Sequence, residues 1–258
     1  MIGGNIMNKT YINEALIRKQ ICEIGDKLYK KDFVAANDGN ISVRLDEKYI
    51  IVTPTGVSKG GMRPEQLVKM TLDGEVIGNN KPSSEVKMHL MAYKCNPKIK
   101  AVVHAHPPIA TAFAVVQKPM DRPILAEAVV NLGIVPVAPY ATPGTVEVPN
   151  SIKDFVTEYN AVLLANHGLL TWGETLEQAY FRMETVEHYG KILLYVDQIG
   201  QPKEFNCDEL ATLLEIRKNI GVEQGGTPTC KREMGQSKSL DEQIASITKR
   251  VLKELTQK

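Results

Sequence analysis

Two apolar runs of the sequence lead to histidines. The run 101–106 ends in a His-x-His pair, His104 and His106, and the run 161–165 leads to His167. Side chains at positions i and i+2 of a β-strand point to the same side, so His104 and His106 can bind one ion. Three neutral imidazoles with one open coordination position are typical of a catalytic Zn²⁺ site. The alternative is three unrelated core or strand-end histidines, but three of the five histidines follow apolar runs, so we predict one Zn²⁺ per subunit.

Strands must position these histidines, and the apolar spacing indicates where strands and helices lie. Helical spacing in 11–31 predicts a helix, and the alternating segment 41–45 predicts a strand. Ser83 or Ser84 is expected to cap a helix that continues after Glu85. Further helices are expected at 108–114, 150–159, 174–197 and 207–219, and further strands at 49–52, up to His104, at 134–137, 161–165 and 169–171.

The mixture of these elements predicts an α/β domain over residues 1–220. The strands that lead to His104 and His167 need not be parallel, so we expect a central, mostly antiparallel or mixed sheet flanked by helices. A doubly wound parallel sheet would predict a Gly-rich first turn. The sequence contains neither GxGxxG nor a GxxxxGK motif followed by Ser or Thr, which argues against that fold.

The composition suits one domain followed by a tail. The chain has 258 residues, 43% of them hydrophobic, and a formal net charge of +1, so it can bury a core and has no strong overall field. Basic and acidic residues are interspersed and aromatic residues are few, which predicts no nucleic-acid binding. Residues 1–7 do not resemble a signal peptide, and no stretch has the roughly 18 apolar residues of a membrane span. We therefore expect a cytoplasmic protein.

The four cysteines are scattered along the chain. Cys22, Cys95, Cys207 and Cys230 form no CxxC pair. In a protein expected to be cytoplasmic, this pattern predicts reduced thiols rather than disulfides or metal ligands. None of them therefore joins the predicted site.

The C-terminal part of the chain has a different pattern. Residues 221–238 are rich in glycine, proline and polar side chains, which predicts a flexible linker. Residues 239–258 predict an amphipathic helix, because their apolar side chains follow a helical spacing: Leu240, Ile244, Ile247, Val251 and Leu255. A helix this short needs a surface to cover its apolar side. That surface belongs either to the chain's own domain or to a different protein. A flexible linker favours a different protein, because a helix of the core would not need one.

Five short motifs occur in a fixed order along the domain. Their order and spacing resemble the class II aldolase/adducin family, in particular its L-fuculose-1-phosphate aldolase branch, over residues 11–220. The segment 138–145 also resembles that branch. The motifs are GNIS at 39–42, TPTG at 53–56, KPSSE at 81–85, HAH at 104–106 and NHG at 166–168.

The resemblance implies roles for the predicted site residues. It implies that His104, His106 and His167 bind Zn²⁺, with Glu85 as the fourth ligand in the resting state. Glu85 also matches the family's acid/base position, which moves a proton on or off the carbon beside the ketone. Taken alone, Glu85 would be a solvated acid in the first turn of a helix. The resemblance favours the catalytic role.

The resemblance also implies a phosphate site. The family's phosphate-binding positions match a set of short donors: Asn40, Thr55, Gly56, Ser83 and Ser84. They supply an amide, hydroxyls and backbone N–H groups, and the two serines lie where a helix is expected to begin. Each of them could instead be a turn or capping residue. Because no nucleotide-binding loop is found, a small sugar phosphate is the expected substrate.

The implied activity is that of a Zn²⁺-dependent aldolase. It would reversibly cleave a ketose 1-phosphate, with L-fuculose 1-phosphate as the leading case, to dihydroxyacetone phosphate and L-lactaldehyde. L-Rhamnulose 1-phosphate and a 5-deoxypentulose phosphate are alternative substrates, and sugar-phosphate 4-epimerisation of the L-ribulose-5-phosphate type is the alternative chemistry. The epimerases usually have aspartate where this chain has Glu85, which favours cleavage. Adducin-like members lack the histidines, and the enzymes of the family are fourfold-symmetric tetramers, so we expect an active homotetramer.

Two features lie outside this pattern. The fucose branch uses a tyrosine of the neighbouring subunit to protonate the aldehyde, but the matching segment 124–129 has only Glu127 as a proton carrier, and a C-terminal tyrosine of the branch aligns near Ile220. The aldehyde-side acid is therefore unassigned. The second feature is the tail 239–258, which resembles the encapsulation peptides that direct enzymes into bacterial microcompartments. A shell protein is the expected partner of the tail, and the compartment lumen is an alternative location.

Overall fold

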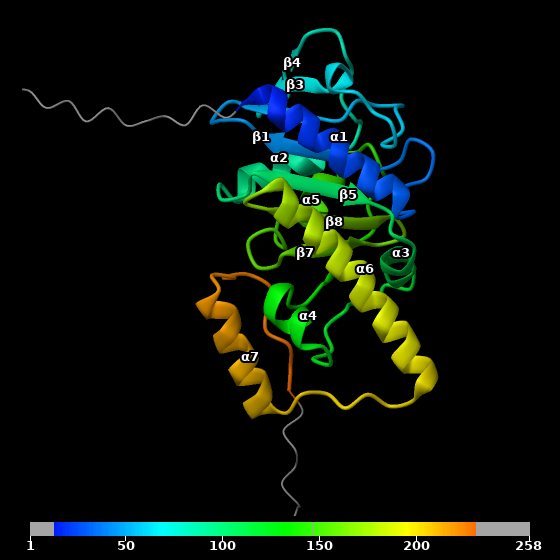
Figure 1. Ribbon diagram of the computed structural model, residues 1–258, viewed down its shortest axis with the longest axis vertical. Helices are drawn as coiled ribbons and strands as arrows, with labels where there is room; N and C mark the ends of the chain where they lie inside the picture. Colours follow the sequence, from blue (N-terminus) through cyan, green and yellow to red (C-terminus); the bar gives the residue numbers. More distant parts are fainter. Residues whose placement is uncertain (1–12, 146, 231–258) are drawn as a thin grey trace, which may run out of the picture.

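A mixed β-sheet forms the centre of this computed structural model, which describes residues 13–145 and 147–230 (Figure 1). Its strands are β1 (Asn40–Arg44), β2 (Tyr49–Val52), β3 (Val68–Thr71), β4 (Val76–Ile77), β5 (Ala101–Ala105), β6 (Val137–Ala138), β7 (Ala161–Leu164) and β8 (Gly168–Gly173). Within the described residues the strand order is β4-β3-β2-β1-β5-β8-β7-β6. Only β6 and β7 pair in parallel among these strands. The predicted α/β fold with a mostly antiparallel sheet is confirmed.

Helices cover both faces of the sheet (Figure 1). They are α1 (Glu14–Lys30), α2 (Val86–Cys95), α3 (Pro108–Val115), α4 (Ala126–Asn131), α5 (Glu147–Ile152), α6 (Leu176–Ile199) and α7 (Cys207–Asn219), with a 3₁₀ turn, η1 (Pro64–Gln66). Val103 belongs to the core that α1, α3, α4 and α6 cover, and its neighbour Val102 belongs to the core that α2 and α5 cover. Adjacent strand residues face opposite sides, so each strand supplies both cores. None of the described helices is long and apolar enough to cross a membrane.

Strand β5 carries the His-x-His pair through the middle of the sheet. All of its residues are buried, as expected for a strand that is covered on both faces. His104 lies opposite Asn40 of β1 on one side and Leu170 of β8 on the other. Strands β7 and β8 form a hairpin, and His167 lies in its turn. The sheet therefore brings the histidine-bearing segments next to one another.

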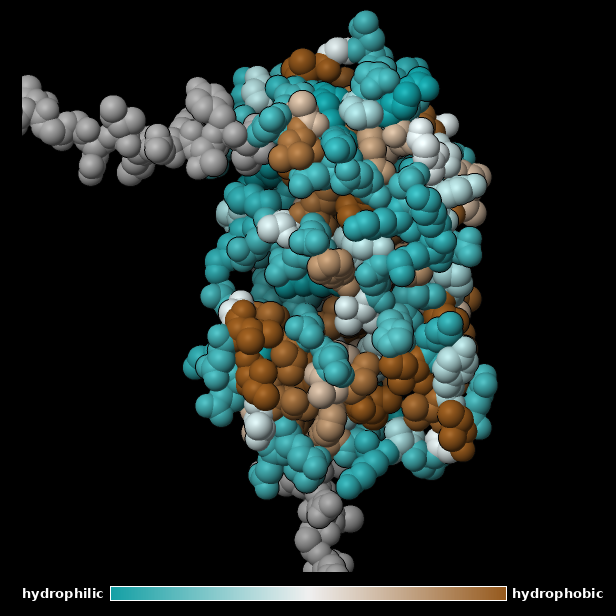
Figure 2. Space-filling model, in the orientation of Figure 1, coloured by the Kyte–Doolittle hydropathy of each residue, from teal (hydrophilic) through white to brown (hydrophobic). Residues whose placement is uncertain are grey.

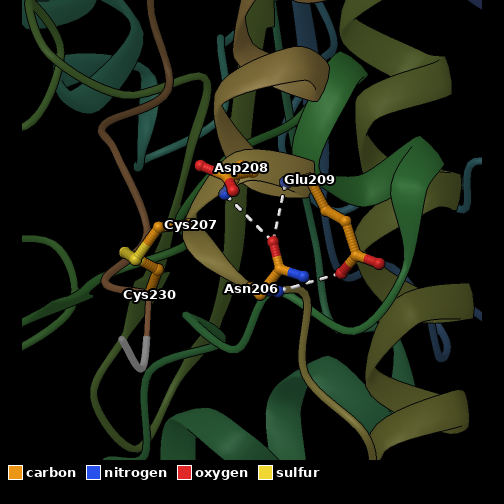
Figure 3. Close-up of a disulfide and its surroundings, with 5 residues drawn as sticks. All are labelled: Asn206, Cys207, Asp208, Glu209 and Cys230. Carbon is orange, nitrogen blue, oxygen red and sulfur yellow. Dashed lines mark hydrogen bonds between the residues drawn. A yellow bond between two sulfur atoms is a disulfide. The ribbon is translucent and has the colours of Figure 1, made fainter. Parts of the chain in front are cut away.

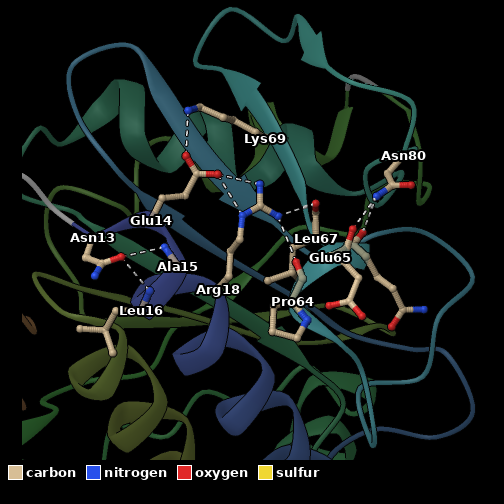
Figure 4. A network of polar contacts seen from close by, with 11 residues as sticks. Asn13, Glu14, Ala15, Leu16, Arg18, Pro64, Glu65, Leu67, Lys69 and Asn80 are labelled. Carbon is tan, nitrogen blue, oxygen red and sulfur yellow. Dashed lines mark hydrogen bonds and ion pairs between the residues drawn. The ribbon is translucent and has the colours of Figure 1, made fainter.

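Polar contacts hold α1 against the edge of the sheet (Figure 4). Glu14 pairs with Arg18 within the helix at 2.8 Å and with Lys69 of β3 at 2.8 Å. The same Arg18 guanidinium donates to the backbone carbonyls of Pro64 and Leu67. These contacts fix α1 beside η1 and β3, so the loop between β2 and η1 has a rigid helix next to it.

Most predicted elements are found, but several of their ends differ. Helix α2 begins at Val86, with Glu85 as its N-cap, and the Ser83 hydroxyl accepts from the Glu85 N–H at 3.3 Å. The helix expected over 150–159 ends at Ile152, and of the strand expected over 134–137 only Val137 lies in a strand, β6. The sequence does not predict β3, β4 or α4, because these elements are too short for a clear apolar period.

The prediction of reduced thiols is wrong for one pair of cysteines. Cys207 and Cys230 form a disulfide with their Cα atoms 5.2 Å apart (Figure 3), whereas Cys22 and Cys95 are free. The bond lies at the start of α7, where the Asn206 side chain caps the helix. The chain returns after α7 and brings together two cysteines that are 23 residues apart, which their spacing in the sequence does not indicate.

The segment 221–230, expected to be part of a linker, packs against the domain. Gly225 donates its N–H to the carbonyl of Glu158 at 2.8 Å, and its own carbonyl accepts from the N–H of Ile134 at 2.7 Å. Backbone pairing of this kind requires a fixed path. Residues 231–258, which include the expected terminal helix, lie outside the described residues.

Candidate metal centre and active site

The structure brings His104, His106 and His167 together at the end of β5. Their ring centroids lie 4.8 to 5.1 Å apart, and one nitrogen of each ring lies within 4.8 Å of the others. The Nε2 atoms of His104 and His106 are 3.1 Å apart. Three nitrogen donors from two parts of the chain, the end of β5 and the β7–β8 turn, therefore converge on a space that could hold a divalent cation.

Neighbouring groups orient two of these imidazole rings. The Nδ1 atom of His104 lies 2.9 Å from the carbonyl oxygen of Leu169. Because a carbonyl only accepts, Nδ1 carries the proton and the lone pair of Nε2 faces the other histidines. The backbone N–H of His106 donates to the carbonyl of Phe33 at 2.9 Å, and its Nδ1 lies 3.5 Å from a carboxylate oxygen of Asp38.

The turn between β7 and β8 explains the Asn-His-Gly motif. Asn166 has a φ of 56°, a conformation that asparagine adopts more readily than most residues. A Cβ atom at position 168 would lie 2.5 Å from Cδ2 of His106 and 2.7 Å from the carbonyl oxygen of Ala105. Glycine at this position therefore lets the turn approach β5 closely enough for His167 to meet the other two rings.

Glu85 completes the cluster from the N-cap of α2. Its Oε1 lies 3.0 Å from Nε2 of His167, and its Oε2 lies 3.5 Å from Nε2 of His104. The side-chain amide of Asn40 donates to Oε2 at 2.8 Å. With 17% of its side chain exposed, Glu85 does not lie in the solvated position that a simple first-turn acid would take. It lies where a fourth ligand or a proton carrier would lie.

The protonation states of the cluster suit a cation. Burial favours the neutral form of Glu85, but the nearby His104 and His167 and the hydrogen bond from Asn40 outweigh it and hold the pKa of Glu85 well below its ordinary value. Burial lowers the pKa of His104 to about 3 and also lowers the pKa of His106. Neutral imidazoles beside an ionised carboxylate are what metal binding requires. The donor set therefore fits a catalytic divalent metal.

Four of the five predicted phosphate-binding residues lie on two loops that meet beside Glu85, and the fifth, Asn40, is the first residue of β1. The N–H of Thr55 donates to the carbonyl of Lys81 at 3.0 Å, and the N–H of Ser83 donates to the carbonyl of Thr53 at 3.1 Å. The loop after β2 and the loop before α2 therefore run side by side. The Ser83 hydroxyl also accepts from the backbone of Glu85, so this cluster adjoins the carboxylate.

These loops differ in how far they face the solvent. Thr55, Gly56 and Ser84 are exposed, whereas Asn40 and Ser83 are buried. Gly56 has a φ of 70°, and a Cβ atom there would have nothing within 4 Å. The backbone at this turn is therefore open to an approaching anion, and the positive φ favours glycine.

Three residues beside the site have no assigned role in the sequence analysis. Lys59 is buried close to the loop of Gly56, and Asp38 lies beside His106. The carboxylate of Glu187, on α6, accepts from two backbone N–H groups at the start of α3, at 3.0 and 2.8 Å. Asp38 and Lys59 adjoin recognised motifs, and this proximity is a signal that could have identified them. Glu187 gives no such signal, because α6 follows the histidines by many residues.

The structure does not assign the aldehyde-side acid. Glu127 is exposed on α4. Ile220 is the C-cap of α7 and is 55% exposed, and its side chain carries no proton that could be transferred.

Known proteins with similar sequences include a decarboxylase and an aldolase. The chain is 34% identical to the 3-oxo-tetronate 4-phosphate decarboxylase of Escherichia coli (strain K12), over 184 residues that cover 70% of this chain and 87% of that protein. It is also 34% identical to the 5-deoxy-D-ribulose 1-phosphate aldolase of Bacillus thuringiensis serovar kurstaki, over 208 residues that cover 79% of this chain and 96% of that protein.

The fold and the domain signature agree with these relatives. A solved structure of an L-fuculose 1-phosphate aldolase is 30% identical and superposes with a TM-score of 0.74, covering 81% of this chain and 99% of that chain. The class II aldolase and adducin N-terminal domain matches residues 19–194, which include Glu85 and the three clustered histidines. The chain is thus an enzyme of the class II aldolase kind and belongs to the class II aldolase and adducin family.

Proposed function

We propose that this enzyme reversibly cleaves a ketose 1-phosphate to dihydroxyacetone phosphate and a short aldehyde. L-Fuculose 1-phosphate, which gives L-lactaldehyde, is the leading substrate. The observation that carries the proposal is the contact of Glu85 with His104 and His167 beside the loops of Thr55 and Ser83. Cleavage of a phosphorylated ketose needs a proton carrier, a cation site and an anion site next to one another.

The proposed ligands are His104, His106, His167 and Glu85, and the proposed metal is Zn²⁺. Three imidazole nitrogens and one carboxylate oxygen form a donor set that suits zinc among the divalent ions. When bound, the metal would supply Lewis acidity at the ketone end of the substrate. The remaining steps depend on the chain's own groups.

Glu85 is the proposed acid/base. When the bond between C3 and C4 of the ketose breaks, the C4 hydroxyl loses its proton and becomes the aldehyde, and the electron pair of the bond stays on C3. Glu85, a carboxylate at rest, takes up through solvent the proton that the C4 hydroxyl releases and gives it to C3, which completes dihydroxyacetone phosphate. The hydrogen bond from Asn40 to Oε2 restricts the carboxyl group to one orientation during this transfer.

The proposed phosphate site consists of neutral donors. Asn40, Thr55, Gly56, Ser83 and Ser84 would supply the amide, hydroxyl and backbone N–H groups that a phosphate accepts. The open turn at Gly56 and the exposure of Thr55 and Ser84 support this role. A small phosphate can approach there, whereas the sequence offers no loop for a nucleotide.

The choice among aldol substrates rests on the segment 138–145 and on Glu85. The segment resembles the fuculose branch, and the glutamate favours cleavage over 4-epimerisation. L-Rhamnulose 1-phosphate and a 5-deoxypentulose phosphate are alternative substrates, because they share the phosphorylated ketone end and differ at the aldehyde end. Epimerisation is the alternative outcome of the same bond cleavage, followed by addition to the other face of the aldehyde.

Decarboxylation is a second candidate, and one observation favours it. The segment 124–129 contains no tyrosine to protonate an aldehyde. Loss of CO₂ from a phosphorylated 3-oxo acid leaves an electron pair on the neighbouring carbon and needs only one proton, which Glu85 could deliver. The similarity to the Escherichia coli decarboxylase supports this alternative.

A substrate panel separates these functions. The zinc-loaded protein is assayed with L-fuculose 1-phosphate, L-rhamnulose 1-phosphate, a 5-deoxypentulose 1-phosphate, L-ribulose 5-phosphate and 3-oxo-tetronate 4-phosphate. Dihydroxyacetone phosphate is detected with a coupled reductase and CO₂ with a coupled carboxylase. The aldolase proposal requires dihydroxyacetone phosphate from one of the 1-phosphates. Release of CO₂ without dihydroxyacetone phosphate from any substrate would replace it with decarboxylation.

We also propose that the enzyme is a homotetramer with sites between subunits. Figure 2 shows apolar side chains gathered over the part of the surface that α4, α6 and α7 form, and an exposed apolar surface of this kind supports a protein interface. The exposed large apolar side chains of α6, α7 and the α7 C-cap are Phe181, Leu194, Tyr195, Ile199, Ile216 and Ile220. Light scattering of the purified protein tests the proposal, and a monomer mass at micromolar concentration contradicts it.

The proposed partner of residues 239–258 is a shell protein of a bacterial microcompartment. The apolar spacing of this segment supports a docking helix, and a reactive aldehyde product gives a chemical reason for enclosure. The enzyme would then act in the lumen, or in the cytoplasm where no shell is present. Deletion of 231–258 tests this and leaves the packed segment 221–230 intact. Equal partitioning of the full chain and the deletion variant into purified shells contradicts the proposal.

A further inference from the structure

Lys59 is buried beside the proposed phosphate site. Its residue is 1% exposed, although lysine is almost never buried without partners. The Nζ ammonium donates to the backbone carbonyl of Asn37 at 2.9 Å and to that of Val57 at 2.7 Å. A buried charge with two fixed acceptors is a costly arrangement, so its position needs a reason.

One carbonyl belongs to the loop that leads to Asn40, and the other belongs to the loop that carries Thr55 and Gly56. Asn37 precedes Asn40 by three residues, and Val57 directly follows Gly56. The ammonium of Lys59 therefore joins the loop before β1 to the loop after β2. This cross-link sets the distance between two parts of the site that are not adjacent in the sequence.

Helix α1 packs against the loop that carries Lys59. A Cβ atom at Gly25 would lie 2.9 Å from the carbonyl oxygen of Lys59, so the helix lies directly against the loop backbone. The carboxylate of Asp26 accepts from the N–H of Gly61 at 2.9 Å. The lysine backbone is thus held between α1 and the site, and its side chain extends from a fixed base.

The charge of Lys59 is as important as its hydrogen bonds. The five proposed phosphate donors are neutral, whereas a sugar phosphate carries up to two negative charges. Lys59 interacts electrostatically with Asp38 and Glu85, which places its charge within range of the site. A charge in the protein interior is weakly screened by solvent, so it acts on an anion without direct contact.

We propose that Lys59 is the anion-positioning residue of this enzyme, which holds the two loops in their binding conformation and supplies the positive charge for the substrate's phosphate. The inference rests on the proposed function and deepens it, because it explains how a set of neutral donors binds a dianion. Burial lowers the pKa of Lys59 to about 8, against the opposing effect of Asp38 and Glu85. A bound phosphate would favour the charged ammonium, and by linkage the charged ammonium favours phosphate binding.

Two probes separate this role from simple loop support. Inorganic phosphate tests the anion site, and acetohydroxamate, which binds a metal but has no phosphate, tests the cation site. Calorimetry with the zinc-loaded full chain gives both affinities for the wild type, Lys59→Met and Lys59→Gln. Lys218→Met, which removes an exposed lysine of α7, is the matched control.

We expect both Lys59 variants to bind phosphate at least about tenfold more weakly, the factor that corresponds to about 1.4 kcal/mol. Acetohydroxamate affinity and zinc content should stay at the wild-type values, and the control should match the wild type with both probes. Unchanged phosphate affinity overturns the inference. An equal loss for both probes also overturns it, because general damage to the site would then explain the result.

The wild-type protein provides a test that does not depend on the stability of the variants. Phosphate should raise the pKa of Lys59, measured by NMR from the pH dependence of its side-chain ¹³Cε resonance, with Lys218 as the internal reference. A pKa of Lys59 that phosphate leaves unchanged overturns the inference. If phosphate raises this pKa but no ketose phosphate is cleaved, the proposed aldolase function fails while the anion site stands. If a ketose phosphate is cleaved but phosphate neither raises this pKa nor binds the variants less tightly, only the role of Lys59 fails.

Discussion

At the scale of single residues, Glu85 is the group on which the proposed chemistry depends. It contacts two histidines and accepts a hydrogen bond from Asn40, so its carboxyl group is both held in place and close to any bound cation. A carboxylate that can leave the metal is then free to move a proton. Glu85 can act both as a metal ligand and as a proton carrier only if its carboxylate lies as close to His104 and His167 as the structure shows.

The substitution Glu85→Gln tests the proton-transfer role. Glutamine keeps the shape and can accept the hydrogen bond from Asn40, but it cannot carry a proton. We expect kcat to fall by about 10² to 10⁴, the usual contribution of general acid–base catalysis, with a much smaller change in KM. Steady-state kinetics of the zinc-loaded variant measure this, with Glu23→Gln, an exposed acid of α1, as the control. A kcat within threefold of the wild type would show that another group transfers the proton.

The residue patterns explain why part of this site can be predicted from the sequence. The grouping of His104 and His106 follows from the two-residue period of a strand, which is local. The approach of His167 depends on the β7–β8 hairpin and on Gly168, and the role of Glu85 depends on resemblance. Lys59 donates to the carbonyl of Asn37 on another loop, and such long-range partners leave no periodic signal. The disulfide at Cys207 is missed for the same reason.

At the scale of elements, a series of polar pairs joins α2 to β1. Every second strand residue meets every fourth helix residue: Asn40 with Glu85, Ser42 with His89, and Arg44 with Tyr93. Two strand residues span about 6.7 Å and four helix residues span about 6 Å, so the two repeats match in length. The series fixes α2 along β1, and its first pair contains the proposed acid/base.

The central pair of this series predicts a pH-dependent stability. His89 is fully buried, its Nδ1 lies 2.7 Å from the Ser42 hydroxyl, and burial lowers its pKa to about 3 from 6.5. The unfolded chain therefore binds more protons between pH 6.5 and 3, and stability is lost as the pH falls through this window. The neighbouring Glu85 opposes the shift, and Tyr93, which bonds the same hydroxyl, is neutral there.

The substitution His89→Gln should remove this part of the pH dependence. Between pH 7 and pH 5, we expect the free energy of unfolding of the variant to fall by about 2 kcal/mol less than that of the wild type. Urea unfolding of the metal-free proteins at the two pH values measures the difference. His188→Gln, at an exposed position on α6, should behave like the wild type. If the free energy of unfolding falls equally for the wild type and His89→Gln between the two pH values, His89 is not buried in its neutral form.

A second contact between elements concerns helix α3, which follows His106. The Glu187 carboxylate accepts from the first N–H groups of this helix, which have no partner within a helix. We expect Glu187→Ala to lower the free energy of unfolding by about 1 kcal/mol, as for the loss of a helix cap, and to weaken binding of the proposed zinc ion, because His106 lies two residues before the helix. Urea unfolding and chelator competition measure the two effects, with Glu215→Ala on α7 as the control. If Glu187→Ala leaves the zinc affinity unchanged, the start of α3 does not influence the proposed metal site.

At the scale of the whole molecule, the sheet and the C-terminal segment have different roles. The sheet holds the proposed site between two helical layers, whereas α7 and residues 221–230 close against α4 and the loop before β7. The disulfide joins the two ends of that closure. None of the proposed site residues lies on α7 or in residues 221–230, so we expect the closure to contribute to stability rather than to the reaction.

The substitution Cys207→Ser tests this division. The cysteines are 23 residues apart, and a loop of this size predicts a loss of about 3 kcal/mol in the free energy of unfolding. We expect kcat and KM at 25 °C to stay unchanged. Reduction of the wild type should lower its denaturant midpoint as the substitution does, and Cys22→Ser should still respond to reductant. If reductant does not change the denaturant midpoint of the wild type, the Cys207–Cys230 disulfide is contradicted.

The covalent closure also has a mechanical consequence for whatever is attached beyond it. Cys230 is bonded to the first residue of α7, so a force applied further along the chain is transmitted directly to the beginning of that helix. The ten residues before Cys230 carry almost none of this load. A force on the chain beyond Cys230 therefore cannot detach the segment that pairs with Glu158 and Ile134 while the disulfide is intact.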